Sequence, residues 1–274
     1  MLNMSSAAIC PSYIPLVADG KPALSSAVHP EVAKEKLAMV IPTLCEAENI
    51  GGLLNHVRSV LDPLDRPYEI LVVDDDSRDG TGELVAAIAL SDPRVRLIVR
   101  KGQRGLSGAI LHGWQHTDAT ILGVMDADLQ HPPELLPLLV SAIDQGCDLA
   151  IGSRYTAGGE LGEWNPARKL VSAAAVWVTW PIQHRRVRAK DPMSGLFMVR
   201  RHCLNNIAFQ NSGFKLLLDI LVRGHIHSVE EVPFAFGCRY RGASKANMKV
   251  AVDYAKLLAR LYSERCGLRW KFRS

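Results

Sequence analysis

Asp126 and Asp128 are the residues whose types and spacing most directly suggest a chemical role. They follow the uncharged apolar run 120–125, which predicts a strand buried on both faces. Because alternate strand residues point to the same side, both carboxylates are expected together at the carboxyl end of that strand. Adjacent carboxylates repel each other unless a cation lies between them, and an all-oxygen site suits Mg²⁺ or Mn²⁺. An isolated pair of this kind could also simply cap the following helix.

Acidic residues also follow two earlier apolar runs. Glu46 comes after the first run, and Asp75 lies in the acid-rich stretch 74–79 after the second. Asp75 could accept hydrogen bonds from the base or ribose of a nucleoside, or the stretch could form only a turn and a helix cap. If these runs are parallel strands of one sheet, their carboxyl ends share an edge, and ligands of open α/β sheets bind at that edge. The acids would then converge on one crevice.

The elements that must position these acids alternate along the chain from Leu37 onward. Apolar runs predict strands, and the stretches between them predict helices. The predicted strands are 37–41, 69–73, 95–99, 121–125 and 149–151, and the predicted helices are 47–61, 81–91, 105–117 and 133–145. Alternation at this spacing predicts right-handed crossovers and an α/β fold, with a Rossmann-like, mainly parallel central sheet and flanking helices.

Glycine spacing argues against two common nucleotide-binding motifs. The first predicted strand ends in the segment 42–46, which contains no Gly-x-Gly-x-x-Gly, and this disfavours a dinucleotide-binding fold. Gly102, Gly105 and Gly108 form a glycine-rich turn after the third strand, but no Gly-Lys-Ser/Thr follows it. Flexibility at the entry to a helix is therefore the preferred interpretation of these glycines.

Composition favours a reducing compartment and a chain without a membrane span. The six cysteines lie far apart and form no Cys-x-x-Cys pair, which argues against a zinc site and a disulfide framework. No segment reaches about 18 uncharged apolar residues, and no positive charge precedes Lys21, so neither a spanning helix nor a secretory signal is expected. The net charge is +4, and residues 248–274 alone carry seven Lys/Arg against two acids. That basic segment is either a solvated helix face or a contact for an anionic membrane or nucleic acid.

Six motifs, in order along the chain, resemble those of the family 2 glycosyltransferases of the GT-A fold. Four of them indicate the family, and two later ones narrow the resemblance to the dolichol- or polyprenol-phosphate mannosyltransferases. The motifs are 40–49, 73–81, 126–133 and 152–155, and then 191–195 and 239–245. The resemblance implies a GT-A catalytic domain at 37–245. A flexible N-terminal tail at 1–36 precedes it, and a basic C-terminal helix at 246–274, expected to be peripheral to a membrane, follows it.

The same resemblance implies roles for particular residues. The nucleoside of a nucleotide-sugar donor would lie against Pro42, Leu44, Glu46, Val73 and Asp75. Asp126, Ala127 and Asp128 would lie at the diphosphate, and Asp126, Asp128 and Gln130 near the metal. Arg154 would act near the phosphates with Asp126 and Asp128 as catalytic residues, Arg168 would bind the acceptor phosphate, and Arg239 and Lys245 would close over the donor. Leu44 and Cys45 depart from the Tyr and Asn that the family usually carries there.

By this resemblance the chain is expected to be an inverting, metal-dependent transferase that moves mannose from GDP-mannose to a polyprenyl phosphate, dolichyl or undecaprenyl. The sequence shows no compelling general base, but a phosphate monoester has a second pKa near 6 and needs none at neutral pH. The enzyme would be cytoplasmic and peripheral at the cytoplasmic face of a membrane. It would touch lipid through residues 170–182, which include Trp177 and Trp180. An ordinary amphipathic core helix is the alternative for that stretch.

Three rival functions stay open. The first is a polyprenyl-phosphate transferase that uses UDP-glucose or another nucleotide sugar, and the second is a soluble glycosyltransferase with a hydroxyl acceptor, which would need a carboxylate base. The third is a non-catalytic binder of nucleotide sugar or nucleic acid, although nucleic acid is not the expected partner. A membrane-anchoring partner protein is also left open.

Overall fold

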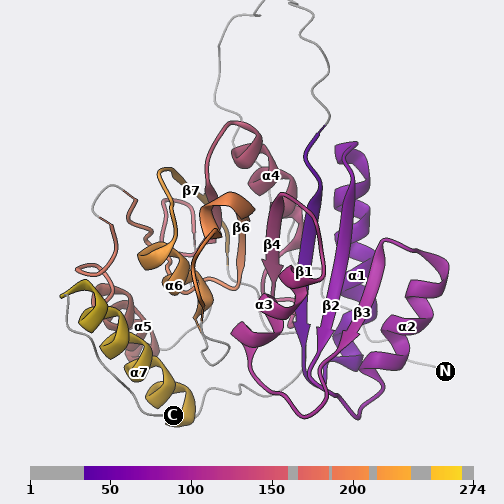
Figure 1. Cartoon of the computed structure of the whole chain (residues 1–274), viewed down its shortest axis with the longest axis horizontal. Helices are drawn as coiled ribbons and strands as arrows, with labels where there is room; N and C mark the ends of the chain where they lie inside the picture. The colour runs from indigo at the N-terminus through magenta and orange to yellow at the C-terminus, as the bar shows by residue number, and fades with distance from the viewer. Residues whose placement is uncertain (1–33, 160–165, 185–186, 210–214, 236–247, 267–274) are drawn as a thin grey trace, which may run out of the picture. The chain divides into compact units, whose positions relative to one another are not determined.

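A seven-stranded sheet in the order β3-β2-β1-β4-β6-β5-β7 forms the centre of the fold (Figure 1). The computed structural model describes residues 34–159, 166–184, 187–209, 215–235 and 248–266, apart from the side chains of 166–171 and 248–251, and these residues belong to the compact unit Lys34–Ser274. The strands are β1 (Leu37–Thr43), β2 (Tyr68–Asp74), β3 (Val95–Val99), β4 (Ile121–Met125), β5 (Leu149–Ser153), β6 (Leu196–Arg200) and β7 (Val229–Pro233). Among the strands of the described residues, β6 alone is antiparallel to its neighbours, β4 and β5. The predicted α/β fold with a mainly parallel sheet is confirmed.

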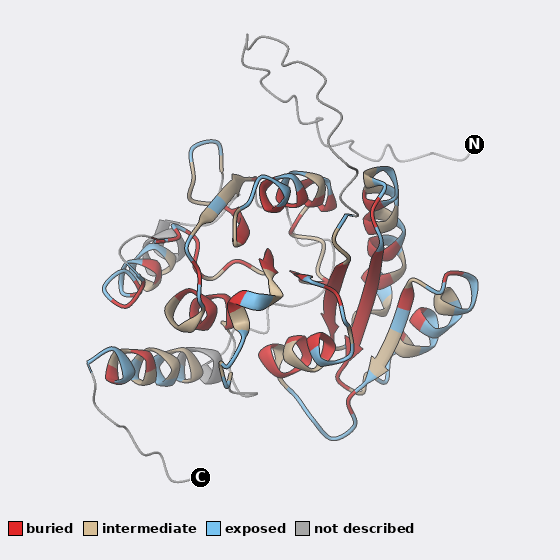
Figure 2. Ribbon diagram, turned by 45° about the horizontal axis from the view of Figure 1, so that its top comes forward, coloured by how far each residue is buried: buried red, intermediate tan, exposed pale blue. Residues whose placement is uncertain are grey.

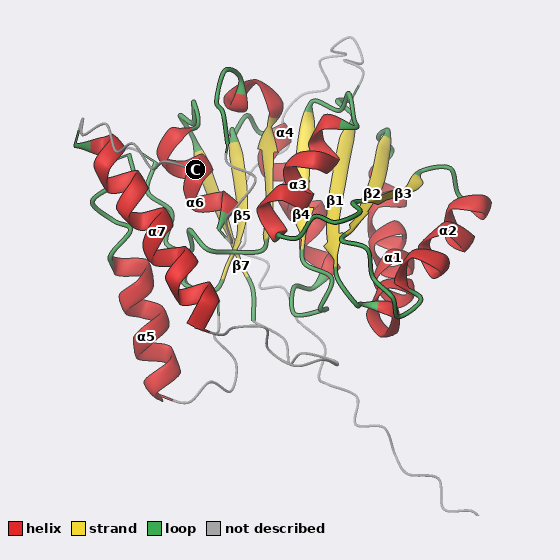
Figure 3. Ribbon diagram, turned by 60° about the horizontal axis from the view of Figure 1, so that its bottom comes forward, coloured by secondary structure: helices red, strands yellow, loops and turns green. Residues whose placement is uncertain are grey.

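Helices cover both faces of the sheet (Figure 3). On one face, α1 (Ala47–Leu61), α2 (Thr81–Ser91) and α4 (Leu136–Asp144) share a buried apolar cluster with the strands, and on the other face α3 (Leu106–Gln115) and α6 (Leu216–Arg223) share a second cluster. Strand β1 supplies both by alternation, with Met39 and Ile41 on the first face and Ala38 and Val40 on the second. Burial is accordingly concentrated in the central strands (Figure 2).

Two further α-helices of the described residues, α5 (Pro166–Trp177) and α7 (Met248–Arg265), lie side by side at the β7 end of the sheet (Figure 1). The hydroxyl of Tyr254 on α7 donates to the carbonyl of Ala175 on α5 at 2.6 Å, and that of Tyr262 donates to the carbonyl of Val178 at 2.6 Å. A third apolar cluster, which includes Leu218 and Leu261, joins α6 to α7. The basic C-terminal segment therefore contains a helix that is packed against the rest of the fold.

The predicted elements agree with the structure in the first half of the chain and are incomplete in the second half. The strands β3 and β4 have the predicted bounds, β1, β2 and β5 extend one or two residues further, and helices α1 and α2 match. The sequence did not predict β6, α6 or β7, and the stretch 170–182 is not one helix, because α5 ends at Trp177 and a turn follows. Over the described residues, no helix combines the length and the apolar character that crossing a bilayer requires.

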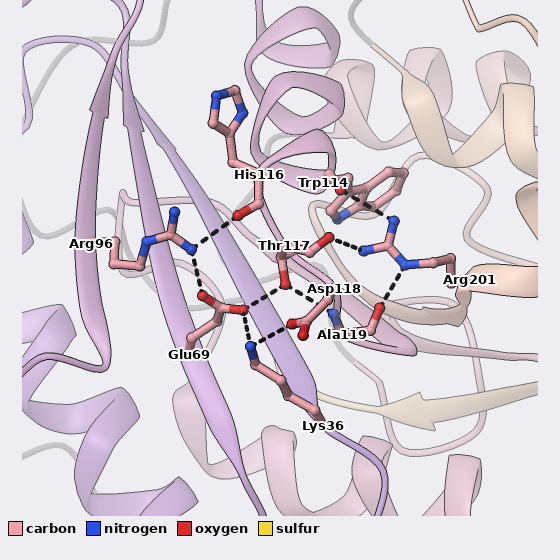
Figure 4. Close-up of polar contacts among 9 residues, drawn as sticks. All are labelled: Lys36, Glu69, Arg96, Trp114, His116, Thr117, Asp118, Ala119 and Arg201. Atoms are coloured by element: carbon pink, nitrogen blue, oxygen red, sulfur yellow. Dashed lines mark hydrogen bonds and ion pairs between the residues drawn. The ribbon is translucent and has the colours of Figure 1, made fainter.

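A buried glutamate joins several segments at the amino edge of the sheet (Figure 4). Glu69 of β2 is 6% exposed, and its Oε1 accepts from Lys36 Nζ at 2.8 Å and Thr117 Oγ1 at 2.6 Å, while its Oε2 accepts from Arg96 at 2.8 Å. Burial acts to raise the pKa of Glu69, but these three hydrogen bonds outweigh it and the pKa lies below its ordinary value. The network connects the residue just before β1, strands β2 and β3, and the loop after α3.

Arg201 completes this edge from the opposite side of the loop (Figure 4). It lies in the short 3₁₀ helix η3 (Arg201–Leu204), and its guanidinium donates to the carbonyls of Ala119 at 2.6 Å, Thr117 at 2.9 Å and Trp114 at 3.3 Å. Carbonyls at and beyond the end of a helix lack partners within the helix, and a guanidinium supplies several donors at once. Arg201 therefore fixes the chain between α3 and β4.

Candidate active site

Three loops that carry the predicted acids meet at the carboxyl edge of the sheet. Strands β2, β1 and β4 are neighbours, with Pro42 paired to Val73 and Val40 paired to Val124. The residues that follow these strands, including Glu46, Asp75 and Asp126, thus leave the sheet at the same edge. The expected placement of these strand ends at one edge of the sheet is confirmed, and the convergence of the acids on one crevice stays a prediction.

Each of these three loops contains a residue other than glycine in the left-handed backbone region. The φ angle is 56° at Cys45, 56° at Asp76 and 59° at Leu129. Aspartate tolerates this region better than most residues, whereas leucine rarely adopts it. Residues in sparsely populated conformations persist only where the surroundings hold them, and they concentrate at functional sites.

The first two loops are held to each other by side-chain hydrogen bonds. Asp74 accepts from Thr43 Oγ1 at 2.8 Å and from the amide of Ser77 at 2.8 Å and its hydroxyl at 2.6 Å, and the Ser77 hydroxyl in turn accepts from the amide of Cys45 at 2.8 Å. Asp79 accepts from the amide of Ala47 at 3.1 Å. These two aspartates therefore organise the turns, as the structural alternative for stretch 74–79 proposed.

Asp75 has a structural role that its position in the sequence did not predict. Its carboxylate is 6% exposed and accepts from Arg100 Nε at 2.7 Å and from the amide of Gly105 at 2.8 Å. The side chain therefore anchors the glycine-rich turn that follows β3 to the end of β2. Its predicted contact with a nucleoside stays a prediction, and this anchoring would hold both groups in place for it.

The other residues predicted to line the nucleoside occupy the same edge. Pro42 and Val73 are buried at the ends of β1 and β2, and Leu44 and Glu46 are half-buried in the loop before α1. The Glu46 carboxylate accepts from Asn49 Nδ2 at 3.0 Å, which orients it at the first turn of that helix. The predicted set is thus together in space.

Asp126 and Asp128 are half-buried just beyond β4, with Ala127 buried between them. The amide of Gln130 donates to Asp128 Oδ1 at 3.2 Å across the left-handed turn at Leu129. A Cβ atom placed on Gly195 would overlap Asp126 Oδ2, so only a glycine leaves room for this carboxylate. Gly195 immediately precedes β6, the strand that pairs with β4, and the glycine of the 191–195 motif thereby gains a physical explanation.

Arg154, just after β5, is held by Asp191, a buried residue of the 191–195 motif. Asp191 is fully buried. Its carboxylate accepts three hydrogen bonds from Arg154, from Nε at 2.7 Å, from Nη2 at 2.8 Å and from the backbone amide at 3.1 Å. Such a two-pronged pair fixes the plane of the guanidinium. The two residues are 37 positions apart, and no spacing pattern in the sequence predicts their pairing.

His131 and Lys215 are two site residues that the sequence reasoning missed. His131 is 3% exposed, its ring centroid lies 5.3 Å from that of Phe234, and burial lowers its pKa to about 4, with the charge of Asp128 opposing the shift. Lys215 donates to the carbonyl of Met193 at 3.2 Å, and burial lowers its pKa to about 8 against the charge of Asp126. A lysine directly before the apolar run of α6 was the available signal for Lys215.

Three predicted residues have no described side chain. Arg168 belongs to α5, but its side chain is outside the described set, and Arg239 and Lys245 lie outside the described residues altogether. The described part of the edge therefore combines the carboxylates of Asp126, Asp128 and Asp191 with the cations of Arg154 and Lys215. Charges of both signs within one edge suit a ligand that contains phosphate and metal.

Family and sequence comparisons both relate this chain to glycosyltransferases. Residues 38–209 match the model of Glycosyl transferase family 2. The chain is 41% identical over 226 residues to the dolichol-phosphate mannosyltransferase of Pyrococcus furiosus. The aligned region covers 82% of this chain but only 63% of the length of that protein. It is 35% identical over 240 residues to the dolichol-phosphate mannosyltransferase of Saccharomyces cerevisiae, covering 84% of this chain and 88% of that one.

Solved structures with low sequence identity share the fold. The mannosyl-3-phosphoglycerate synthase of Rubrobacter xylanophilus superposes with a TM-score of 0.64 at 18% identity, over 88% of this chain and 77% of that one. The glucosyl-3-phosphoglycerate synthase of Mycobacterium tuberculosis, solved with Mn²⁺, UDP-glucose and glycerol 3-phosphate, superposes with a TM-score of 0.59 at 20% identity, over 86% and 82% of the two chains. Both TM-scores exceed 0.5 over most of the chain, and this shared fold confirms the predicted fold class.

Proposed function

The chain belongs to glycosyl transferase family 2, among the dolichol-phosphate mannosyltransferases, and we propose that it moves mannose from GDP-mannose to a polyprenyl phosphate with inversion of the anomeric centre. The observation that carries this proposal is the pair Asp126 and Asp128 at the edge where Arg154 and Lys215 also lie. Carboxylates can hold a cation against a diphosphate, and the two basic side chains suit a second phosphate.

The residues present fit a divalent metal ion. Asp126 and Asp128 offer an all-oxygen donor set, and the missing side chain at Gly195 leaves the space that the Asp126 carboxylate fills. Mg²⁺ and Mn²⁺ prefer oxygen ligands and are commonly held by one or two carboxylates together with substrate phosphates. When bound, such an ion would neutralise charge that develops on the leaving diphosphate. We propose Asp126, Asp128 and Gln130 as the protein groups that hold it.

The remaining steps depend on positioning. A polyprenyl phosphate is mostly dianionic at neutral pH and can attack without losing a proton. Asp191 orients Arg154 in one plane, and this arrangement would place the acceptor phosphate for in-line attack. Arg168 is proposed as a second acceptor-phosphate group, Arg239 and Lys245 as donor groups, and Pro42, Leu44, Glu46, Val73 and Asp75 as the nucleoside side of the site.

The long isoprenoid acceptor implies contact with a membrane. Trp177, the last residue of α5, is 72% exposed, and in the turn that follows Val178 is 40% and Trp180 42% exposed. The guanidinium of Arg188 lies 5.7 Å from the Trp180 ring centroid. Exposed tryptophan beside arginine suits the interfacial region of anionic lipid. We therefore propose a peripheral position at the cytoplasmic face of a membrane, with residues 177–180 as one contact.

The test is a transfer assay with one short polyprenyl phosphate, comparing GDP-mannose with UDP-glucose, with and without a chelator. Replacement of Asp128 by Ala should lower kcat at least ~10²-fold, because the ion that stabilises the leaving group loses a ligand. Asp118→Ala is the matched control, since Asp118 is an exposed aspartate at the amino edge. NMR of the product should show the inverted anomer.

Each outcome separates the parts of the proposal. Full activity of Asp128→Ala, or indifference to the chelator, would contradict the metal site. Faster transfer from UDP-glucose would show that GDP-mannose is not the preferred donor, but it would not contradict the metal site. Retained anomeric configuration would exclude single in-line attack.

A further inference from the structure

Three segments that are distant in sequence meet at the amino edge of β5, opposite the candidate active site. They are the residues just before β5, the 3₁₀ helix η3 that follows β6, and the loop just before β7. Asp148 of the first segment and the adjacent His202 and Cys203 of η3 each offer one ligand atom, and these three atoms lie within 4.8 Å of one another. The proposed mechanism uses none of these residues.

The Asp148 carboxylate is oriented by the backbone. Its Oδ2 accepts from the amide of His227 at 2.8 Å and from that of Ser228 at 3.2 Å, and the amide of Asp148 donates to Ser228 Oγ at 2.9 Å. The other oxygen, Oδ1, lies 3.9 Å from His202 Nε2. Outer hydrogen bonds that fix a carboxylate in this way are typical of the support around metal ligands.

The two partners of Asp148 differ in how far they can move. Cys203 is fully buried, and its carbonyl accepts from the amide of His225 at 2.8 Å, which holds η3 against the loop before β7. The side chain of His202 is 67% exposed and can rotate about its side-chain bonds. Ligand atoms about 2.0–2.3 Å from a tetrahedral ion lie roughly 3.5 Å apart, so a modest rotation of His202 would close the set.

We propose that Asp148, His202 and Cys203 form a binding site for a zinc-like transition-metal ion, separate from the carboxylate site of Asp126 and Asp128. Thiolate, imidazole and carboxylate are ligands of Zn²⁺ and its neighbours, whereas Mg²⁺ takes oxygen alone. On binding, the bond between sulfur and the metal forms, the S–H bond of Cys203 breaks and its proton leaves to solvent, with no oxidation or reduction. Water would complete the coordination shell.

The far-apart cysteines had argued against such a site, because the familiar zinc motifs draw paired ligands from one short segment. Here Asp148 comes from one segment and the adjacent His202 and Cys203 from another, and only the fold brings the two segments together. The ion would join the start of β5 to the end of β6. Strand β5 ends at Ser153, next to Arg154, so the ion would brace the strand that carries this arginine.

The test is Co²⁺ titration of the full chain in excess Mg²⁺, which occupies oxygen-only sites. The expected result is one bound Co²⁺ with a thiolate-to-cobalt charge-transfer absorption. His202→Ala should bind Co²⁺ at least tenfold more weakly, and Cys203→Ser should lose the absorption. His184→Ala and Cys266→Ser, which change exposed residues outside the cluster, should behave as the parent chain.

A second measurement uses Zn²⁺ and thermal unfolding. Because a ligand that binds the folded chain stabilises it, Zn²⁺ should raise the Tm of the parent chain by about 3 °C or more and that of His202→Ala by clearly less. The exposed His202 allows this variant to fold even if the Cys203 variant does not. Absence of thiolate absorption in the parent chain, or equal Co²⁺ affinity in His202→Ala and His184→Ala, would overturn the proposal.

Discussion

Gly195 lacks the side chain that any other residue would place where the Asp126 carboxylate lies. The carboxylate at the end of β4 and the glycine before β6 thus depend on each other, although 69 positions separate them in the sequence. At this scale, the geometry of the candidate metal site is set as much by a missing atom as by the acids themselves.

Replacement of Gly195 by Ala should therefore impair transfer without unfolding the chain. The added methyl group would displace the Asp126 carboxylate, and we expect kcat to fall by about 10²-fold, the magnitude seen when a group that stabilises transition-state charge is lost. Steady-state kinetics and a thermal melt measure the two effects. Gly52→Ala in α1, where an added Cβ meets nothing within 4 Å, is the control and should retain activity. Equal activity of the two variants would refute the role of Gly195.

His131 should make the free energy of unfolding depend on pH. Its pKa is about 4 in the folded chain against an ordinary value of 6.5, so between these values the unfolded chain binds a proton that the folded chain does not. Stability should therefore fall as the pH falls from 6.5 to 4, by roughly 3 kcal/mol at most. Urea unfolding at several pH values should give a flatter dependence for His131→Gln. Parallel curves for the two proteins would contradict this assignment.

At the scale of elements, local sequence patterns suffice for β1 to β4 and for the helices between them, because each strand is built around an apolar run and a helix follows it along the chain. The same patterns miss β6 and β7. Strand β7 is only half-buried and carries Glu230 and Glu231, and β6 is a run of four apolar residues, which periodicity alone cannot distinguish from part of a buried helix. Tertiary pairing determines these strands, and no local period shows it.

The site shows the same division between local and distant information. The ends of apolar runs correctly predicted that Glu46, Asp75 and Asp126 share an edge. The partners of those residues could not be predicted, because Asp75 with Gly105, Arg154 with Asp191 and Asp126 with Gly195 are contacts across 30 residues or more. His131 and Lys215 join the site by the same kind of long-range packing.

The network around Glu69 tests how the amino edge of the sheet is held together. Glu69→Gln would leave Lys36 and Arg96 without their shared carboxylate, and since both are partly exposed and screened we expect a loss of about 1–3 kcal/mol. The pKa of Glu69 lies below its ordinary value of 4.5 in the folded chain, so its stabilisation is present above that pH and is lost as the pH falls further.

Urea unfolding of the parent chain and of Glu69→Gln at pH 7 and pH 3 measures this effect. The difference between them should be largest at pH 7 and shrink at pH 3. Glu83→Gln, on the exposed side of α2, is the control and should match the parent chain. A difference that grows on acidification would contradict the assignment.

At the scale of the whole molecule, the two edges of the sheet have different roles. The carboxyl edge carries the loops that are proposed to bind the donor and acceptor, while the amino edge is tied by the Glu69 network, by Arg201 and by the proposed site at Asp148. Helices α5 and α7 lie at the β7 end of the sheet, and so do the exposed Trp177, which ends α5, and Trp180, which follows it. Binding and bracing are thus assigned to separate regions of one sheet.

The exposed pair Trp177 and Trp180 is expected to contribute to membrane binding. Trp177→Glu combined with Trp180→Glu should weaken sedimentation with anionic vesicles at least tenfold, because two interfacial anchors are replaced by charges that the lipid repels. Binding of GDP, followed by thermal shift, should be unchanged. Leu90→Glu alters a leucine of α2 that is 91% exposed and serves as the control. Unchanged sedimentation of the double variant would argue against this membrane contact.

The left-handed turns at Cys45, Asp76 and Leu129 bear on the thermodynamics of donor capture. A flexible loop that must adopt a rare conformation loses conformational entropy when its ligand arrives, and that loss is subtracted from the affinity. In this chain the hydrogen bonds of Asp74, Ser77 and Asp128 already hold these turns in the described structure. A nucleotide sugar would therefore meet a preorganised rim, and most of the contact energy gained there would appear as affinity.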